Sequence, residues 1–183
     1  MRLMRTVSVS AVVMVCLAAT GLMTPAFADH HEAALFKEAL SAAPPELAKG
    51  AKVMDWEGNT LKEGDNGWTC MPTAPHLDGV APMCNDSVWM EWADAYLNKK
   101  DYAGGKFGVS YMLAGDAGAS NIDPYAEGPT DDNQWVVEGS HLMILVSDPA
   151  VLEGMSTDPW NGGPYVMWKG TPYVHIMVPV DSE

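Results

Sequence analysis

Two His-x-Met segments in the C-terminal third of the sequence carry the side chains best suited to binding a metal. His141 and Met143 form the first pair, and His175 and Met177 form the second. Both pairs lie in apolar runs that predict strands, where residues i and i+2 point to the same face. If the two strands pack side by side about a pseudo-twofold axis, two imidazoles and two thioethers converge. This ligand set suits Cu(I) and tolerates Cu(II), so we expect a site for a late transition metal, copper first.

An internal near-repeat surrounds the two pairs and covers 123–143 and 158–177. Its copies open with DPYAEGP and DPWNGGP, which agree at five positions by identity or aromatic class. Each copy continues through a Trp and a Gly into its His-x-Met run. The agreement at both ends indicates a shared origin or a shared role for the two strands.

Other interpretations of the same residues stay open at this stage. Methionine in a strand often fills a core, and histidine at the start of a strand is often held by a backbone hydrogen bond. A repeat can also be kept for packing symmetry alone, and one of the histidines could be catalytic. Only the positions of the side chains can separate these hypotheses.

The N-terminus predicts an export signal. Residues 1–5 include two arginines, 7–22 is an apolar run, and PAFA at 25–28 has the small residues that precede signal cleavage. We expect cleavage after Ala28, which leaves a domain over 29–183 without a membrane anchor. The predicted location is the periplasm or the extracellular space.

Cleavage at that position would create a second candidate metal site. The new terminus would read Asp29, His30, His31. A histidine in third place lets the free amine, two deprotonated amides and an imidazole surround Cu(II) or Ni(II) in a square plane. The site competes with a helix start, because Asp29 and Glu32 also match the N-cap and N3 positions of a capping box.

The cysteines fit an oxidising compartment. Removal of the signal takes Cys16 away and leaves Cys70 and Cys84, for which a disulfide is the default outside the cytosol. A metal or redox role for this pair would favour Cys-x-x-Cys spacing, which is absent. We therefore expect a structural disulfide.

The charge balance restricts the partners. The chain of 183 residues has 10 Lys and Arg against 24 Asp and Glu, a formal net charge of -14. Nucleic acids and anionic membranes are excluded, because both are bound through positive charge. A metal ion or a small ligand remains, and the sequence leaves a protein partner open.

The pattern of elements predicts one α+β domain with an antiparallel sheet, two or three short helices and one disulfide. Asn66-Gly67 is the strongest hairpin signal and stands between two of the expected strands. The expected helices cover 29–42, 45–49, 87–100 and, as a short element, 149–155. For the third, Asn85-Asp86-Ser87 offers a cap, and an apolar, aromatic face recurs at helical spacing and is expected to enter the core: Val88, Trp89, Trp92, Ala93, Tyr96 and Leu97. The expected strands cover 52–56, 60–63, 68–71, 107–113, 134–137, 141–146, 165–168 and 173–180.

Two further functions compete with metal binding. A binding module for a small ligand or a protein partner would use the Gly-rich loop at 115–121 and aromatic side chains at Trp68, Trp135, Trp160 and Trp168. A hydrolase would need an acid and base pair, for which the candidates are Glu91, Asp94, Asp116, Asp123, Glu138 and Asp158. The common nucleophile, zinc-protease and phosphate-loop motifs are absent, so we expect a binding protein rather than an enzyme.

Three segments resemble those of exported bacterial proteins. They read GDNGWTCMP at 64–72, GDAGASNIDP at 115–124 and GGPYVMWKGTPYVHIMVPV at 162–180. The resemblance implies an export signal followed by a single domain. It transfers no activity, ligand or catalytic residue.

Overall fold

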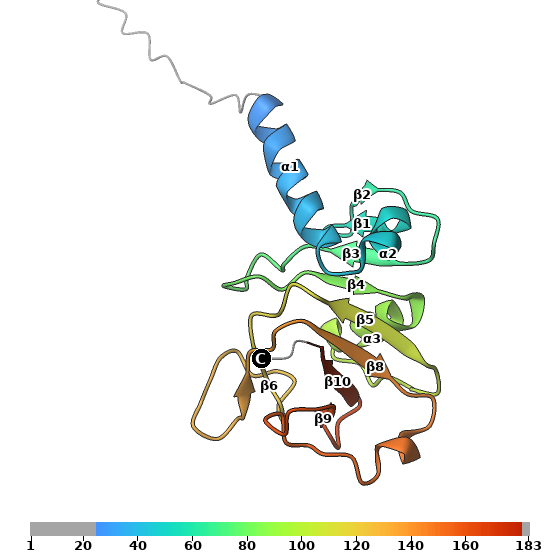
Figure 1. Cartoon of the computed structure of the whole chain (residues 1–183), viewed down its shortest axis with the longest axis vertical. Helices are drawn as coiled ribbons and strands as arrows, with labels where there is room; N and C mark the ends of the chain where they lie inside the picture. Colours follow the sequence, from blue (N-terminus) through green and yellow to red (C-terminus); the bar gives the residue numbers. More distant parts are fainter. Residues whose placement is uncertain (1–24, 181–183) are drawn as a thin grey trace, which may run out of the picture.

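An eight-stranded, largely antiparallel sheet organises the chain (Figure 1). The structure is a computed structural model and describes residues 25–180. The strand order is β2-β1-β3-β4-β5-β8-β10-β9, and β6 and β7 form a small separate ribbon. These strands are β1 (Lys52–Met54), β2 (Thr60–Lys62), β3 (Thr69–Met71), β4 (Met83–Asn85), β5 (Gly108–Met112), β6 (Ala119–Ser120), β7 (Trp135–Val136), β8 (His141–Leu145), β9 (Tyr165–Met167) and β10 (His175–Pro179).

The helices lie around this sheet. They are α1 (Pro25–Leu40), α2 (Pro45–Gly50), α3 (Ser87–Leu97) and the short 3-10 helix η1 (Pro149–Leu152). Together with a disulfide between Cys70 and Cys84, they confirm the predicted α+β class. Within residues 25–180, no helix combines the length and the apolar character needed to cross a membrane.

The first helix starts earlier than predicted. It begins at Pro25, so Asp29 lies inside α1 and the expected N-cap at that residue is wrong for this chain. Proline fits the first turn of a helix because its fixed φ is helical and its missing N–H would have no partner there. The predicted cleavage point after Ala28 falls within α1, and residues 1–24 of the predicted signal lie outside the described residues.

Asp86 fixes the third helix to the sheet. Its Oδ1 accepts a hydrogen bond of 2.7 Å from the Trp89 N–H, which caps the start of α3 as the sequence predicts. Its Oδ2 accepts another of 2.7 Å from the Val109 N–H on β5. One carboxylate therefore sets both the position of α3 and the local register of the strand that follows it.

We expect Asp86→Ala to lower the free energy of unfolding by about 2 kcal/mol, because a cap and a cross-element hydrogen bond are lost together. Urea denaturation measures the change. Asp86→Asn is the matched control, since its single amide oxygen can keep the cap but not both bonds, and it should lose about half as much. An alanine variant within about 0.5 kcal/mol of wild type would contradict this role.

Two buried clusters make up the core. The larger lies between α3 and the C-terminal strands, and the aromatic face of α3 enters it as predicted. Its buried members are Ala81, Trp89, Trp92, Met112, Met143, Leu145, Tyr165, Met167, Trp168, Tyr173 and Met177. The smaller lies beneath α1 and contains Ala39, Ala42, Ala43, Ala51, Val53, Cys70 and Cys84.

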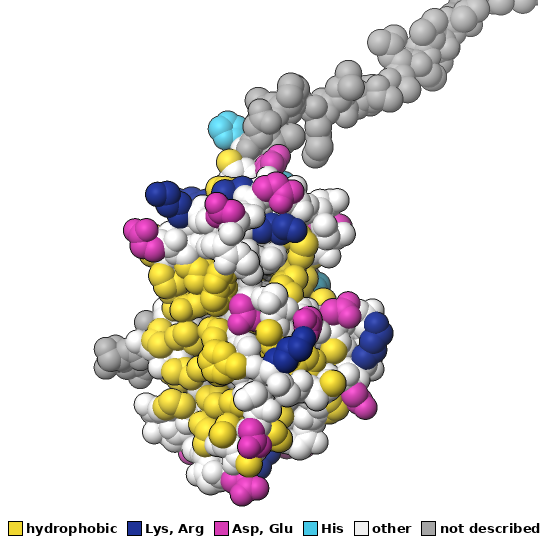
Figure 2. Space-filling view, turned by 90° about the vertical axis from the view of Figure 1, so that its right-hand side faces the viewer, with side chains coloured by type: hydrophobic (Ala, Val, Ile, Leu, Met, Phe, Trp, Pro, Cys, Tyr) yellow, Lys and Arg dark blue, Asp and Glu magenta, His cyan; other side chains and the backbone are white. Residues whose placement is uncertain are grey.

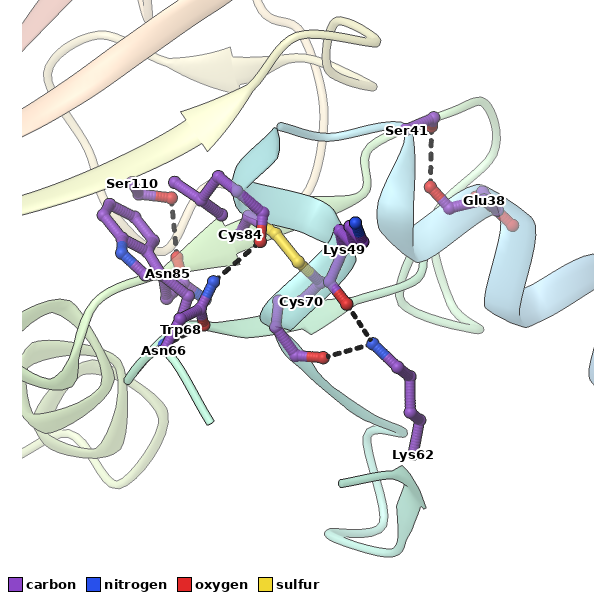
Figure 3. Close-up of a disulfide and its surroundings, with 12 residues drawn as sticks. Glu38, Ser41, Lys49, Lys62, Asn66, Trp68, Cys70, Cys84, Asn85 and Ser110 are labelled. Carbon is purple, nitrogen blue, oxygen red and sulfur yellow. Dashed lines mark hydrogen bonds between the residues drawn. A yellow bond between two sulfur atoms is a disulfide. The ribbon is translucent and has the colours of Figure 1, made fainter. Parts of the chain in front are cut away.

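The disulfide crosses between two neighbouring strands (Figure 3). Cys70 on β3 pairs directly with Cys84 on β4, and both side chains are fully buried. On the adjacent strand, the Ser110 hydroxyl donates a buried 2.6 Å hydrogen bond to the amide oxygen of Asn85. The predicted pairing of the cysteines is thus confirmed.

Strands β5, β8 and β10 have a second face, which points away from the larger core cluster and is apolar and half-buried. Along β5, β8 and β10, core-facing residues alternate with less buried ones. Figure 2 shows hydrophobic side chains gathered over the body of the molecule below α1, with charged groups scattered among them. The half-buried apolar side chains of these three strands are Val109, Tyr111, Leu142, Ile144, Ile176 and Val178.

Candidate functional site

The two His-x-Met strands are neighbours in the sheet. Strand β8 pairs antiparallel with β10, and Met143 lies directly opposite Met177. His141, Met143, His175 and Met177 all belong to the buried face, with His141 0% and His175 1% exposed. The structure therefore places all four predicted ligands on one face of two adjacent strands.

The same register separates the two imidazoles along the strands. His141 lies opposite Pro179, four positions beyond His175. At about 3.3 Å per residue, the two histidine backbones are about 13 Å apart along the sheet, on either side of the methionine pair. The four residues share a face, but their backbones do not converge on one point.

Each histidine also lies opposite a methionine on the other strand that pairs with its own. Met112 on β5 lies directly opposite His141, and Met167 on β9 lies directly opposite His175. Side chains in such pairs have Cβ atoms about 5 Å apart. We call Met112, His141, Met143, Met167, His175 and Met177 the His–Met face. The sequence argument missed Met112 and Met167, because only the pairing register identifies them.

Both imidazoles are held through Nδ1. The Nδ1 atoms of His141 and His175 lie 2.7 Å and 2.9 Å from the carbonyl oxygens of Gly139 and Tyr173. A carbonyl only accepts, so Nδ1 carries the proton and Nε2 keeps its lone pair. Neither buried Nε2 atom has a hydrogen-bond partner among the described residues. Metal-binding histidines use this tautomer, with the second nitrogen held by a backbone carbonyl.

Burial keeps His175 neutral. It lowers the pKa of His175 to about 4, against a weaker opposing effect of the bond to Tyr173, and the nearby His141 lowers it further. At neutral pH the Nε2 lone pair is therefore free of a proton. A metal ion would not have to displace one.

Aromatic rings surround His175. Its ring centroid lies 5.0 Å from that of Trp168 and 5.6 Å from those of Trp89 and Trp92, all at near-perpendicular angles. The indole N–H of Trp92 is also buried without a hydrogen-bond partner in the described part of the chain. This half of the face is buried and has soft, polarisable neighbours.

Carboxyl groups lie near His141. Burial raises the pKa of Asp116, while His141 lowers it electrostatically. Oδ1 of Asp116 accepts from the Gly118 and Glu138 N–H groups at 2.8 Å and 3.1 Å. The Tyr165 hydroxyl donates a 2.7 Å hydrogen bond to Glu138. The surroundings of the two histidines thus differ in polarity.

The other proposed carboxylates serve local structure. Asp123 and Asp158 accept hydrogen bonds from the backbone N–H of Tyr125 and Trp160. Glu91 pairs with Lys106, and Asp94 accepts from the side chain of Asn98. Of the six candidates for an acid and base pair, only Asp116 and Glu138 are brought together near a buried histidine.

The aromatic candidates do not form one surface. Trp160 is exposed, Trp68 and Trp135 are half-buried, and Trp168 belongs to the core. In the Gly-rich segment, Ser120 and Asn121 are buried and hydrogen-bonded. Two shallow depressions of the surface include none of these tryptophans. The first is lined by Glu32, Ala33, Phe36, Leu61 and Lys62. The second is lined by Lys49, Gly50, Lys62, Glu63, Gly64 and Asp65.

The N-terminal candidate lies in a helix in this chain. Residues Asp29, His30 and His31 have helical backbone within α1, and the two histidines lie on the exposed part of the helix. Cleavage after Ala28 would be required before their amides could bind a metal. Among residues 25–180, no three His, Cys, Asp or Glu side chains gather into a group suited to a metal ion.

Comparisons with protein-family models, with curated proteins and with solved structures find no match. The chemistry of the His–Met face, whose methionine sulfurs are also potential ligands, is therefore the basis for a functional assignment.

Proposed function

We propose that this protein binds copper, as Cu(I), on the His–Met face. The imidazole Nε2 atoms of His141 and His175 and the thioethers of Met143 and Met177 are the ligands. The observation that carries the proposal is the pair of buried Nε2 lone pairs, both without hydrogen-bond partners among residues 25–180, on a face that also holds the facing methionines. A buried polar atom without a partner costs free energy, and a bound metal would recover it.

The ligand types favour Cu(I) over other ions. Thioethers are soft ligands that select Cu(I), whereas Mg²⁺ and Ca²⁺ take oxygen ligands. Both imidazoles are buried, so water would not compete for the metal at either one. The net charge of -14 raises the local concentration of cations around the molecule.

The proposal includes export. A signal over 1–28 would deliver the domain to the periplasm or outside the cell, where the disulfide between Cys70 and Cys84 is stable. Two features of the sheet support the near-repeat. Met143 faces its counterpart Met177, and the strand order β5-β8-β10-β9 is symmetric about that pair. The protein would then bind copper in an oxidising compartment.

An anaerobic titration against a chromophoric Cu(I) chelator tests the proposal. The chain is expressed with its own signal, and its mature terminus is confirmed by mass. We expect wild type to hold Cu(I) against the chelator. His141→Ala/His175→Ala and Met143→Leu/Met177→Leu should each weaken binding by at least about 100-fold, equivalent to about 3 kcal/mol.

The leucine variants preserve side-chain volume, and circular dichroism with urea denaturation verifies their fold. His76→Ala is the matched control because His76 is exposed and distant in sequence from the His–Met face. Unchanged binding in both double variants would overturn the proposal and direct attention to Asp29, His30 and His31. Absence of Cu(I) binding by wild type would also overturn it.

A second candidate is a binding module that uses two aromatic turns. The backbone N–H groups of Tyr125 and Trp160 donate to Asp123 and Asp158 at 2.9 Å and 3.0 Å, so both Asp-Pro turns contain the same hydrogen bond. Both turns expose an aromatic ring. The test adds a sugar or a peptide and follows tryptophan fluorescence in wild type and in Trp160→Phe. A fluorescence change in wild type that is lost in the variant would support this alternative.

A further inference from the structure

We infer that the His–Met face holds two Cu(I) ions, one at each imidazole, with Met112 and Met167 as additional ligands. This inference rests on the proposed copper binding and specifies its stoichiometry. Each ion would be bound by a group of one imidazole nitrogen and two thioether sulfurs.

The pairing register defines the two groups. His141 has Met143 two positions later on its own strand and Met112 directly opposite on β5. His175 has Met177 two positions later on its own strand and Met167 directly opposite on β9. Both arrangements use the same offsets, so they present equivalent ligand sets.

The symmetry of the sheet relates these groups. Strands β8 and β10 are central in the order β5-β8-β10-β9, and Met143 faces Met177 between them. A local twofold axis through that pair exchanges His141 with His175 and Met112 with Met167. The three-residue arrangement therefore occurs twice in one sheet, although Met112 lies outside the near-repeat in the sequence.

The separation of the histidines argues against one shared ion. A metal bound by both imidazoles would need both Nε2 atoms at about 2 Å. The backbones are about 13 Å apart along the strands. Each Nδ1 bonds to the carbonyl two residues before its histidine, on the side away from the central methionine pair. The two rings are therefore anchored to different carbonyl oxygens, at points well separated along the sheet.

The surroundings offer charge compensation in both halves. Near His141, the carboxyl groups of Asp116 and Glu138 lie close enough to interact electrostatically with one another, and Asp116 interacts with the histidine. Near His175, three indole rings surround the imidazole, and aromatic faces attract cations through their quadrupoles. A monovalent ion with soft ligands suits both environments.

Stoichiometry tests the inference. The full chain is loaded anaerobically with Cu(I) and analysed by native mass spectrometry and by chelator titration. We expect two equivalents for wild type and one retained equivalent for each of Met112→Leu and Met167→Leu. The double variant should retain neither at the same chelator concentration. Met54→Leu on β1 is the matched control, since Met54 lies outside the face.

Each outcome separates the two proposals. One Cu(I) in wild type, lost equally in His141→Ala and His175→Ala, would overturn the two-site inference and keep the proposed function. Two equivalents retained in the Met112→Leu/Met167→Leu variant would overturn the assignment of these ligands. No Cu(I) bound by wild type would overturn both. Urea midpoints verify that the variants fold.

Discussion

We expect Cys70→Ala/Cys84→Ala to lose about 3 kcal/mol of unfolding free energy, because the disulfide restricts the unfolded chain. The two cysteines are 14 positions apart and directly opposite on β3 and β4. Both are fully buried in the smaller core cluster, beneath α1. Their loss therefore weakens the part of the sheet that packs beneath α1, next to the strand β5 that contributes Met112 to the His–Met face.

Urea denaturation of the oxidised wild type and the double variant measures this loss. Reduced wild type is the control that keeps both sulfur atoms, so it separates the effect of the bond from the effect of the missing side-chain atoms. Cu(I) stoichiometry should stay unchanged under conditions where the variant is folded. A difference below about 1 kcal/mol would contradict a stabilising role for the disulfide.

Local signals predicted much of the fold. The cap at Asp86 and the helical spacing of Trp89 and Trp92 identified α3 and its buried face, because these features depend on neighbouring residues. The disulfide was predictable from the expected export and from the even number of cysteines that the expected cleavage leaves. The alternating burial of β5, β8 and β10 likewise follows from the period of two in a strand.

Non-local contacts overturned the expected hairpin at Asn66-Gly67. Strand β1 lies between β2 and β3, and it pairs in parallel with β3. The Asn66 side chain donates a 2.7 Å hydrogen bond to the Leu47 carbonyl in α2. A Cβ on Gly64 would lie 2.1 Å from the Lys52 backbone nitrogen, so the chain passes tightly across the start of β1. These contacts join segments that local turn propensity does not consider.

The candidate site was predictable in part. Spacing placed each imidazole on the same strand face as a methionine, and the near-repeat suggested that the two strands meet. Spacing could not reveal that Met112 and Met167 face the histidines, because that depends on register between strands distant in sequence. Trp89 and Trp92 were expected in the core, whereas Trp168 was expected in an aromatic binding surface, and the contacts of all three with an imidazole required the packed structure.

We expect the metal-free protein to become less stable as the pH falls from about 6.5 to about 4, because His175 is buried in its neutral form. Burial lowers the pKa of His175 to about 4 in the folded state. An unfolded histidine titrates near 6.5, so the unfolded state binds its proton first as the pH falls. The stabilising difference is complete above pH 6.5 and is lost through this window, on the order of 3 kcal/mol in total.

Urea denaturation of wild type and His175→Gln across this pH range isolates the effect, because glutamine does not titrate. The carboxyl of Asp116 acts in the opposite direction, since burial raises its pKa, but it is common to both proteins. The unfolding free energy of His175→Gln should therefore fall less than that of wild type between pH 6.5 and pH 4. Parallel curves for the two proteins would show that the His175 imidazole accepts a proton in the folded core. With its folded-state pKa at about 4, the buried imidazole is neutral at pH 6.5 and over much of the range below it, so its Nε2 lone pair is available to a metal there.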